Sequence, residues 1–223
     1  MCARLPRRYA AGVHPGTVDG VTRIFATAGS LREGSFNWRL LRRAEEIAPE
    51  GIEFDTFTGL ADIPFFSQDL EGEATPAAVL DMRARIAAAD ALLVATPEYN
   101  GGMPGVLKNA LDWASRPAGA SPVKGKPAAV IGASPGGRGA VRGQQNARDV
   151  LAAIGANVLD EELSAGRFHE LPSEDGTPRD TDLDVRIESH LRRLAVLAGV
   201  SIEGLAQSAE YSIACQRLAD ARA

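Results

Sequence analysis

The sequence has few of the residues that build disulfide scaffolds, metal centres and nucleic-acid surfaces. Its 223 residues include two cysteines, Cys2 and Cys215, near opposite ends, and three histidines at scattered positions. No Cys-x-x-Cys pair or other metal-ligand spacing exists, so we expect neither a disulfide framework nor a metal site. The formal net charge is −5. Because nucleic-acid surfaces usually need a basic field, we expect no nucleic-acid partner.

Long apolar runs are also missing. The longest is far too short to cross a bilayer, so we expect no membrane insertion. Arg7-Arg8 resembles the start of a twin-arginine export signal, but the segment that follows is not the apolar region such a signal needs. The sequence therefore favours a cytoplasmic protein, with residues 1–20 as an N-terminal tail.

Short apolar segments do occur, and they alternate with segments of helical spacing. Apolar residues make up 45% of the chain, enough for a core. The patterns predict strands at 24–27, 52–57, 91–95, 128–131 and from 157, and helices near 35–48, 76–89, 104–115, 144–154 and 180–198. Five such units predict an α/β domain over residues 21–199, a doubly wound five-stranded parallel sheet of order 2-1-3-4-5. The segment 52–57 is its edge strand, and residues 200–223 form a C-terminal extension.

Three unusual loops follow the first, third and fourth predicted strands. In such a sheet, ligands bind beyond the carboxyl ends of the strands near the switch in strand order. Loop 1 (residues 29–37, G-S-L-R-E-G-S-F-N) offers hydroxyl donors, a positive charge and a helix N-terminus, which suit a phosphate. Its donors are Ser30, Arg32, Ser35 and Asn37. The alternative for loop 1 alone is an ordinary capped turn.

The other two loops have compositions suited to close contact with a ligand. Loop 2 (residues 96–104, T-P-E-Y-N-G-G-M-P) carries two prolines and two glycines, and Tyr99 or Asn100 can shape a wall for a flat, reducible ring such as a flavin. Loop 3 (residues 132–139, G-A-S-P-G-G-R-G) permits a close approach but is a weak signal by itself. For each loop the alternative is a structural turn or a flexible connection.

Together these segments resemble a known family. The runs G-S-L-R-E-G-S-F-N, T-P-E-Y-N-G-G-M-P-G-V-L-K-N-A-L-D-W and G-A-S-P-G-G are similar to those of NADPH-dependent FMN reductases, especially the bacterial chromate and quinone reductases and the azoreductases. The resemblance implies a flavodoxin-like fold, an FMN cofactor and a homodimer or homotetramer. It also implies that loop 1, with Phe36, holds the FMN phosphate and that loops 2 and 3 line the ring. The ring-lining residues implied are Pro97, Glu98, Tyr99, Asn100, Gly101, Ser134 and Gly136.

This resemblance predicts an enzyme whose flavin carries the chemistry, so no catalytic side chain is expected. NADPH or NADH is the expected co-substrate, and the acceptor is a small molecule such as a quinone, chromate, an azo compound or free flavin. Donor and acceptor would bind alternately, in a ping-pong scheme. A non-enzymatic flavodoxin-type electron carrier and a flavin-free binding or sensor module are the alternatives.

Three further expectations concern individual residues. Arg138 or Arg142 can contact the 2′-phosphate of NADPH, although solvated surface arginines are the simpler interpretation. Glu98 is expected to point away from the ring toward an arginine or lysine, because its charge would oppose the charge of a reduced flavin. The predicted helix at 104–115 carries more apolar surface than one sheet face needs, which favours an oligomer. Its apolar residues are Val106, Leu107, Ala110, Leu111 and Trp113.

Overall fold

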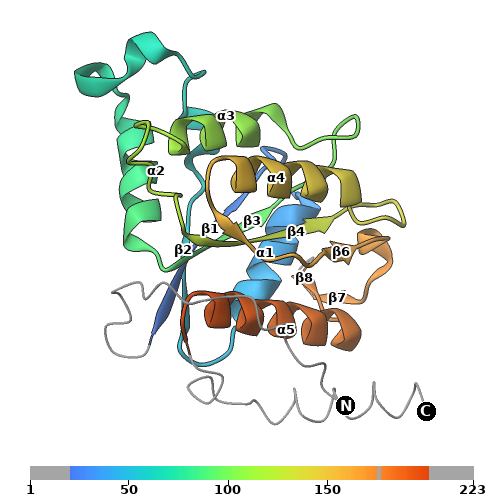
Figure 1. The fold of residues 1–223 in the computed structure, drawn as a ribbon. Helices are drawn as coiled ribbons and strands as arrows, with labels where there is room; N and C mark the ends of the chain where they lie inside the picture. The colour runs from blue at the N-terminus through green and yellow to red at the C-terminus, as the bar shows by residue number, and fades with distance from the viewer. Residues whose placement is uncertain (1–20, 175–176, 201–223) are drawn as a thin grey trace.

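The computed structural model describes residues 21–174 and 177–200, and it shows a parallel sheet with helices on both faces (Figure 1). The sheet order is β2-β1-β3-β4-β5, with β6 also paired to β4, as expected for a doubly wound flavodoxin-like domain. The strands are β1 (Thr22–Ala28), β2 (Ile52–Thr56), β3 (Ala91–Ala95), β4 (Pro127–Ala133), β5 (Asn157–Val158) and β6 (Leu163–Ala165). The expected tail at 1–20, with Cys2, and residues 201–223, with Cys215, lie outside the described residues.

The fifth strand position differs from the prediction, because two short strands share it. β5 pairs with the start of β4 at Pro127 and Ala128, and β6 pairs with its end, from Ile131 to Ala133. Between them, residues 159–162 contain an acidic run, and acidic residues are poor strand formers. One of these, Glu161, forms an ion pair with Arg193. The interruption leaves β6 beside the carboxyl end of β4.

Helices cover the two faces of the sheet unequally (Figure 1). They are α1 (Phe36–Glu46), α2 (Ala77–Ala88), α3 (Gly105–Ala114), α4 (Val141–Ala153) and α5 (Thr181–Leu197). One buried cluster joins α1 and α5 to the sheet through Leu40, Leu41, Leu191 and Leu194. The other joins α2, α3 and α4 to the opposite face. The strands β3 and β4 are buried on both sides, which explains their uninterrupted apolar sequences.

Helix ends mostly follow the sequence signals. Ser35 caps α1, its side chain accepting from the N–H of Trp38, and Asp180 caps α5 by accepting from Leu183. The helix predicted from residue 144 begins three residues earlier, at Val141, after Ala140 in the left-handed conformation. Short 3₁₀ segments, η1 (Gly59–Asp62), η2 (Gln68–Leu70), η3 (Gly72–Ala74) and η4 (Phe168–Glu170), and the hairpin β7 (Ser173–Glu174) and β8 (Thr177–Pro178) were not predicted.

One expectation about α3 is wrong. Its apolar side chains were expected to exceed the needs of one sheet face, but Leu107, Ala110, Leu111 and Trp113 are buried within the chain, and Val106 is half-buried. The indole Nε1 of Trp113 donates to the carbonyl of Pro64, so the segment after β2 covers this helix. The apolar surface of α3 therefore gives no support to an oligomer. No helix in the described ranges is long and apolar enough to span a membrane.

Candidate flavin site

Loops 1, 2 and 3 lie together at one edge of the sheet. β1, β3 and β4 are neighbouring parallel strands, so the loops that follow them leave from the same edge. Gly29 donates its N–H to the carbonyl of Ala95, and Thr96 donates to the carbonyl of Ile131. These bonds continue the strand pairing into the loops. The sequence-predicted site residues are thereby brought to one place from three distant segments.

Loop 1 presents polar groups at the N-terminus of α1. Ser35 uses its hydroxyl as the helix cap, but the N–H groups of Phe36 and Asn37 have no acceptor among the described residues. Arg32 is exposed, and its guanidinium donates to the carbonyl of Gly34 at 3.2 Å. Free amides, the positive end of a helix and a cation are the features that bind a phosphate. Loop 1 therefore fits the phosphate group of FMN.

Asn37 requires a correction, because its side chain is not available to a phosphate. The amide nitrogen donates to the carbonyl of Ala133 at 3.1 Å, and the amide oxygen accepts from the N–H of Ala133 at 2.9 Å. The side chain is 2% exposed. Asn37 instead ties the start of α1 to the end of β4, and so joins loop 1 to loop 3. Only its backbone N–H remains for an anion.

Ser30 joins loop 1 to loop 2. Its hydroxyl lies 3.5 Å from that of Tyr99, and it also accepts from the N–H of Arg32 at 3.4 Å. The carbonyl of Ser30 accepts from the indole Nε1 of Trp38 at 2.9 Å. Trp38 was predicted only as a helix residue. Its donation reaches back from the third residue of α1 to the start of loop 1, and no sequence pattern indicates it.

Loop 2 turns back on itself in a defined geometry. Tyr99 and Gly102 exchange two backbone hydrogen bonds, and the two residues between them, Asn100 and Gly101, have φ of 53° and 85°. Positive φ at both central positions defines a type I′ turn, which Asn-Gly favours. Tyr99 is 51% exposed at the tip. The predicted irregular loop is thus a tight turn that presents an aromatic ring at the rim of the site.

Glu98 reaches α4, but its partner there is a backbone N–H and not the predicted arginine or lysine side chain. Its Oε2 accepts from the backbone N–H of Arg142 at 3.0 Å, in the first turn of α4. A carboxylate at a helix N-terminus is favoured by the helix dipole. Gly143 lets the helix approach closely, since a Cβ there would lie 2.5 Å from the carbonyl oxygen of Pro97. Pro97 is buried at this contact. Glu98 therefore attaches loop 2 to α4.

Loop 3 is held against the chain that follows β6. Ser134 donates its N–H to the carbonyl of Ala165, and Gly136 accepts from the N–H of Arg167 at 2.9 Å. The hydroxyl of Ser134 donates to the carbonyl of Gly136, so its proton is engaged within the loop. A Cβ at Gly139 would lie 2.7 Å from the backbone of Ala165. The expected alternative, a flexible loop, does not describe this segment.

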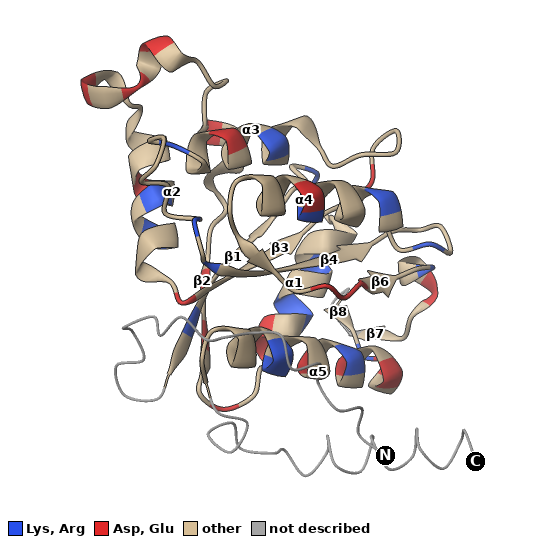
Figure 2. Ribbon diagram, viewed as in Figure 1, with Lys and Arg blue, Asp and Glu red and all other residues tan. Residues whose placement is uncertain are grey.

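Three arginines lie in or beside the loops, together with two carboxylates, Glu33 and Glu98. Arg32, Arg138 and Arg142 are all exposed, and Figure 2 shows basic residues on the loop from β4 and at the start of α4. Within residues 21–174 and 177–200, no group of histidine, cysteine and carboxylate side chains could hold a metal ion. The exposed arginines can bind an anionic cofactor.

Comparison with known proteins agrees with this geometry. A family model for NADPH-dependent FMN reductases matches residues 22–170. The chain is 43% identical over 139 residues to an NAD(P)H-dependent FMN reductase of Pseudomonas aeruginosa, covering 62% of this chain and 74% of that protein. It is 38% identical over 139 residues to quinone reductase of Escherichia coli, covering 62% and 73%.

A solved structure is similar over a longer part of the chain. FerB of Paracoccus denitrificans, a flavoenzyme NAD(P)H:(acceptor) oxidoreductase, matches with a TM-score of 0.74 and 34% identity, over 80% of this chain and 98% of FerB. The expected enzyme class, the FMN cofactor and the NAD(P)H co-substrate are confirmed by these matches. The chain belongs to the NADPH-dependent FMN reductase family.

Proposed function

We propose that loops 1, 2 and 3 form the FMN site and that the enzyme transfers hydride from NAD(P)H to quinones and related small acceptors. One observation carries this proposal: side chains of the three motifs connect the loops to one another and to α4. Asn37 joins loop 1 to the start of loop 3, Ser30 approaches Tyr99 of loop 2, and Glu98 attaches loop 2 to α4. Such joints hold a site in shape before its ligand arrives.

In this proposal loop 1 binds the phosphate through Arg32, the hydroxyls of Ser30 and Ser35, and the N–H groups of Phe36 and Asn37. Loop 2 forms one wall from Pro97 to Gly101, and Ser134 and Gly136 of loop 3 close another side. When bound, FMN supplies the hydride transfer chemistry, so the protein needs no nucleophile. The residues of the chain bind and orient the cofactor and leave Tyr99 at the open rim.

The acceptor class rests on the relatives and on this exposed rim. One relative is named quinone reductase and another, from a Burkholderia species and 43% identical over 139 residues, is named 2-hydroxy-1,4-benzoquinone reductase. We propose quinones as the main acceptors, with chromate, azo compounds and free flavin as further ones, reduced in a ping-pong scheme. A homodimer, or next a homotetramer, and a cytoplasmic location complete the proposal.

Steady-state kinetics test the acceptor assignment. The FMN-loaded protein is assayed with NADPH and NADH against a benzoquinone, chromate, an azo dye and free FMN, at several fixed concentrations of donor. A ping-pong scheme gives parallel lines in double-reciprocal plots, with the highest kcat/KM for the quinone. Intersecting lines would reject the alternating scheme, and activity confined to free FMN would reject quinones as acceptors. Light scattering at micromolar concentration tests the oligomer, which a monomer would exclude.

A further inference from the structure

Arg39, on the second turn of α1, is a basic residue that the FMN site as described does not use. Its guanidinium carbon lies 5.8 Å from the ring centroid of Phe36, and that of Arg32 lies 5.4 Å from the same centroid. Both guanidinium groups approach Gly34. Arg32 donates to the Gly34 carbonyl, and a Cβ on Gly34 would lie 3.4 Å from Nη2 of Arg39. Two cations are thus held close to one backbone position.

Neither cation has a carboxylate partner among the described residues. The ion pairs found there involve other arginines, such as Arg43, Arg85 and Arg116. Holding like charges together is unfavourable unless an anion lies between or beside them. One phosphate at loop 1 already has Arg32, the helix N-terminus and two amides. Arg39 supplies a second positive charge beside loop 1.

Arg39 also lines a small hollow next to loop 1. The other lining residues are Phe168, His169, Leu171, Ser173 and Pro178. The hollow is small, with a cavity volume of about 40 Å³, far below the range that holds a whole drug-sized ligand, so it suits at most one small group of a larger molecule. Phe168 packs against Phe36 at a tilt of 40°, with ring centroids 5.3 Å apart, which places the hollow beside the ring that both arginines approach. Arg39 and exposed His169 are its basic groups, and Nε2 of His169 lies 3.7 Å from Oε1 of Glu170.

We propose that Arg39 and His169 form a second phosphate subsite, separate from the site of the FMN phosphate. Because the proposal takes loop 1 as the FMN phosphate site, it rests on the proposed function. The ligand class is a phosphate ester of a dinucleotide. Two sources carry that chemistry here: the 2′-phosphate of NADPH, and the adenylyl phosphate of FAD, which is bonded to the phosphate that FMN already has. The subsite sets the preference among dinucleotides and leaves FMN affinity unchanged.

Two binding experiments distinguish these sources without using enzyme activity. In the first, FMN-loaded protein is titrated calorimetrically with 2′,5′-ADP, which carries the 2′-phosphate, and with 5′-AMP, which lacks it. In the second, apoprotein is titrated with FAD and with FMN. Each is repeated with Arg39→Gln, Arg39→Lys and His169→Asn. Arg42→Gln is the matched control, because Arg42 is an exposed arginine on the same helix that does not line the hollow.

We expect Arg39→Gln to weaken either 2′,5′-ADP or FAD at least fivefold, and 5′-AMP and FMN less than twofold. His169→Asn should have a smaller effect in the same direction, and Arg39→Lys should retain part of the affinity. Loss confined to 2′,5′-ADP assigns the subsite to NADPH, and loss confined to FAD assigns it to the adenylyl phosphate. Absence of binding by both probes, equal losses in Arg42→Gln, or an equal loss of FMN would overturn the proposal.

Failure of the proposed function gives a different result. If the apoprotein does not take up FMN, loop 1 is not a flavin phosphate site and the basis of the proposal is removed. If FMN binds normally and Arg39→Gln changes no dinucleotide, only the second subsite is rejected.

Discussion

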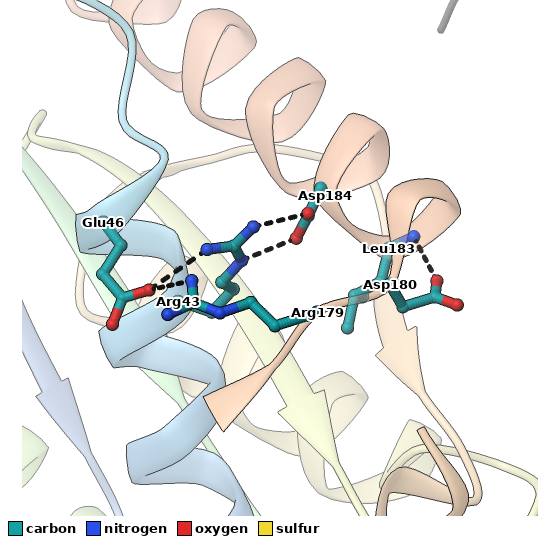
Figure 3. A network of polar contacts seen from close by, with 6 residues as sticks. All are labelled: Arg43, Glu46, Arg179, Asp180, Leu183 and Asp184. Carbon is teal, nitrogen blue, oxygen red and sulfur yellow. Dashed lines mark hydrogen bonds and ion pairs between the residues drawn. The ribbon is translucent and has the colours of Figure 1, made fainter. Parts of the chain in front are cut away.

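Near the C-terminal end of α1, Arg43 is paired with carboxylates, whereas within the described residues Arg32 and Arg39 at the N-terminal end are not. Figure 3 shows Arg43 donating twice to Asp184 of α5, at 2.8 and 2.6 Å, and once to Glu46, which also accepts from Arg179. The hydrogen bonds that Arg43 donates to Asp184 raise the pKa of Arg43 above its ordinary value, although burial opposes this. Arg32 and Arg39 have no carboxylate partner in the described chain.

The difference indicates two uses of the same residue type. Arg43 is partly buried, and its two bonds to Asp184 attach α5 to α1. Such a group contributes to stability, and it has no capacity left for a ligand. Arg32 and Arg39 are available at the sheet edge where the three loops meet. The comparison predicts that changes at the two ends of α1 affect different measurements.

The largest effect is expected on FMN affinity, from changes at the N-terminal end of α1. Replacing Arg32 and Ser35 together with alanine removes two donors to a dianion, and should weaken FMN binding by about 3 kcal/mol, roughly a hundredfold. Fluorescence titration of the apoprotein measures this, with Arg42→Ala as a control for charge. Because Ser35 also caps α1, the single variant Ser35→Ala is measured as well, to show how much of the loss in FMN affinity comes from removing the cap and the Ser35 donor alone. A folded double variant with unchanged affinity would reject loop 1 as the phosphate site.

A third basic residue, His190 on α5, is buried in its uncharged form. Burial, followed by the charges of Arg148 and Arg186, lowers the pKa of His190 to about 4. The unfolded chain binds a proton near pH 6.5 and the folded chain only near 4, so stability is lost as the pH falls between these values. The loss should total about 3 kcal/mol. Urea unfolding at pH 7 and 4.5 measures it.

A variant separates His190 from other titrating groups. His190→Gln should flatten the decline below pH 6.5, whereas His169→Gln, at an exposed position, should leave it in place. FMN affinity at pH 7 should be the same in both. An unchanged slope in folded His190→Gln would show that other groups cause the acid sensitivity.

At the paired end of α1, Arg43→Met keeps the aliphatic part of the side chain and removes its three bonds. It leaves Asp184 without this partner, so the free energy of unfolding should fall by about 2 kcal/mol. FMN affinity should stay within twofold of the wild type. Urea unfolding and flavin titration are run on the same samples, with Arg42→Met beside them. A loss of FMN affinity without a loss of stability would contradict the division between the two ends.

Glu98→Gln should have the smallest effect. Glutamine can still accept from the N–H of Arg142, and only the interaction of a negative charge with the N-terminus of α4 is lost, about 0.5 kcal/mol. We expect FMN to remain bound, and the KM for the acceptor to change more than the rate of flavin reduction by NAD(P)H. Stopped-flow measurement of that half-reaction decides this. A hundredfold loss of its rate, with the oligomer intact, would place Glu98 in hydride transfer itself.

The fold could be predicted because its signals are local. The apolar runs of β3 and β4 and the helical spacing of α2 and α5 are each visible within one segment, and the strand order is the one common to flavodoxin-like sheets. β6 escaped prediction because Leu163-Ser164-Ala165 is too short to show a period. The hairpin β7–β8 is shorter still. β6 is a strand because it pairs with β4, and β7 and β8 are strands because they pair with each other; local propensity does not predict either.

The sequence predicted which loops form the candidate site, but it did not predict the hydrogen-bond partner of each side chain. Loops 1, 2 and 3 could be placed together, since parallel neighbours end at the same edge. The partner of Asn37 lies 96 residues away at Ala133, and a polar residue in a phosphate-binding pattern does not reveal such a bond. The same holds for Glu98 and the backbone of Arg142, and for Trp38 and the carbonyl of Ser30. These contacts depend on tertiary packing.

The most direct test of the account compares FMN with riboflavin on the wild-type apoprotein. The two ligands share the ring that loops 2 and 3 would line, and they differ only in the phosphate that loop 1 would bind. We predict a dissociation constant of about a micromolar or tighter for FMN, near −8 kcal/mol, and binding of riboflavin at least tenfold weaker. Equal affinities for FMN and riboflavin would show that loop 1 does not bind the phosphate, and would contradict the central claim.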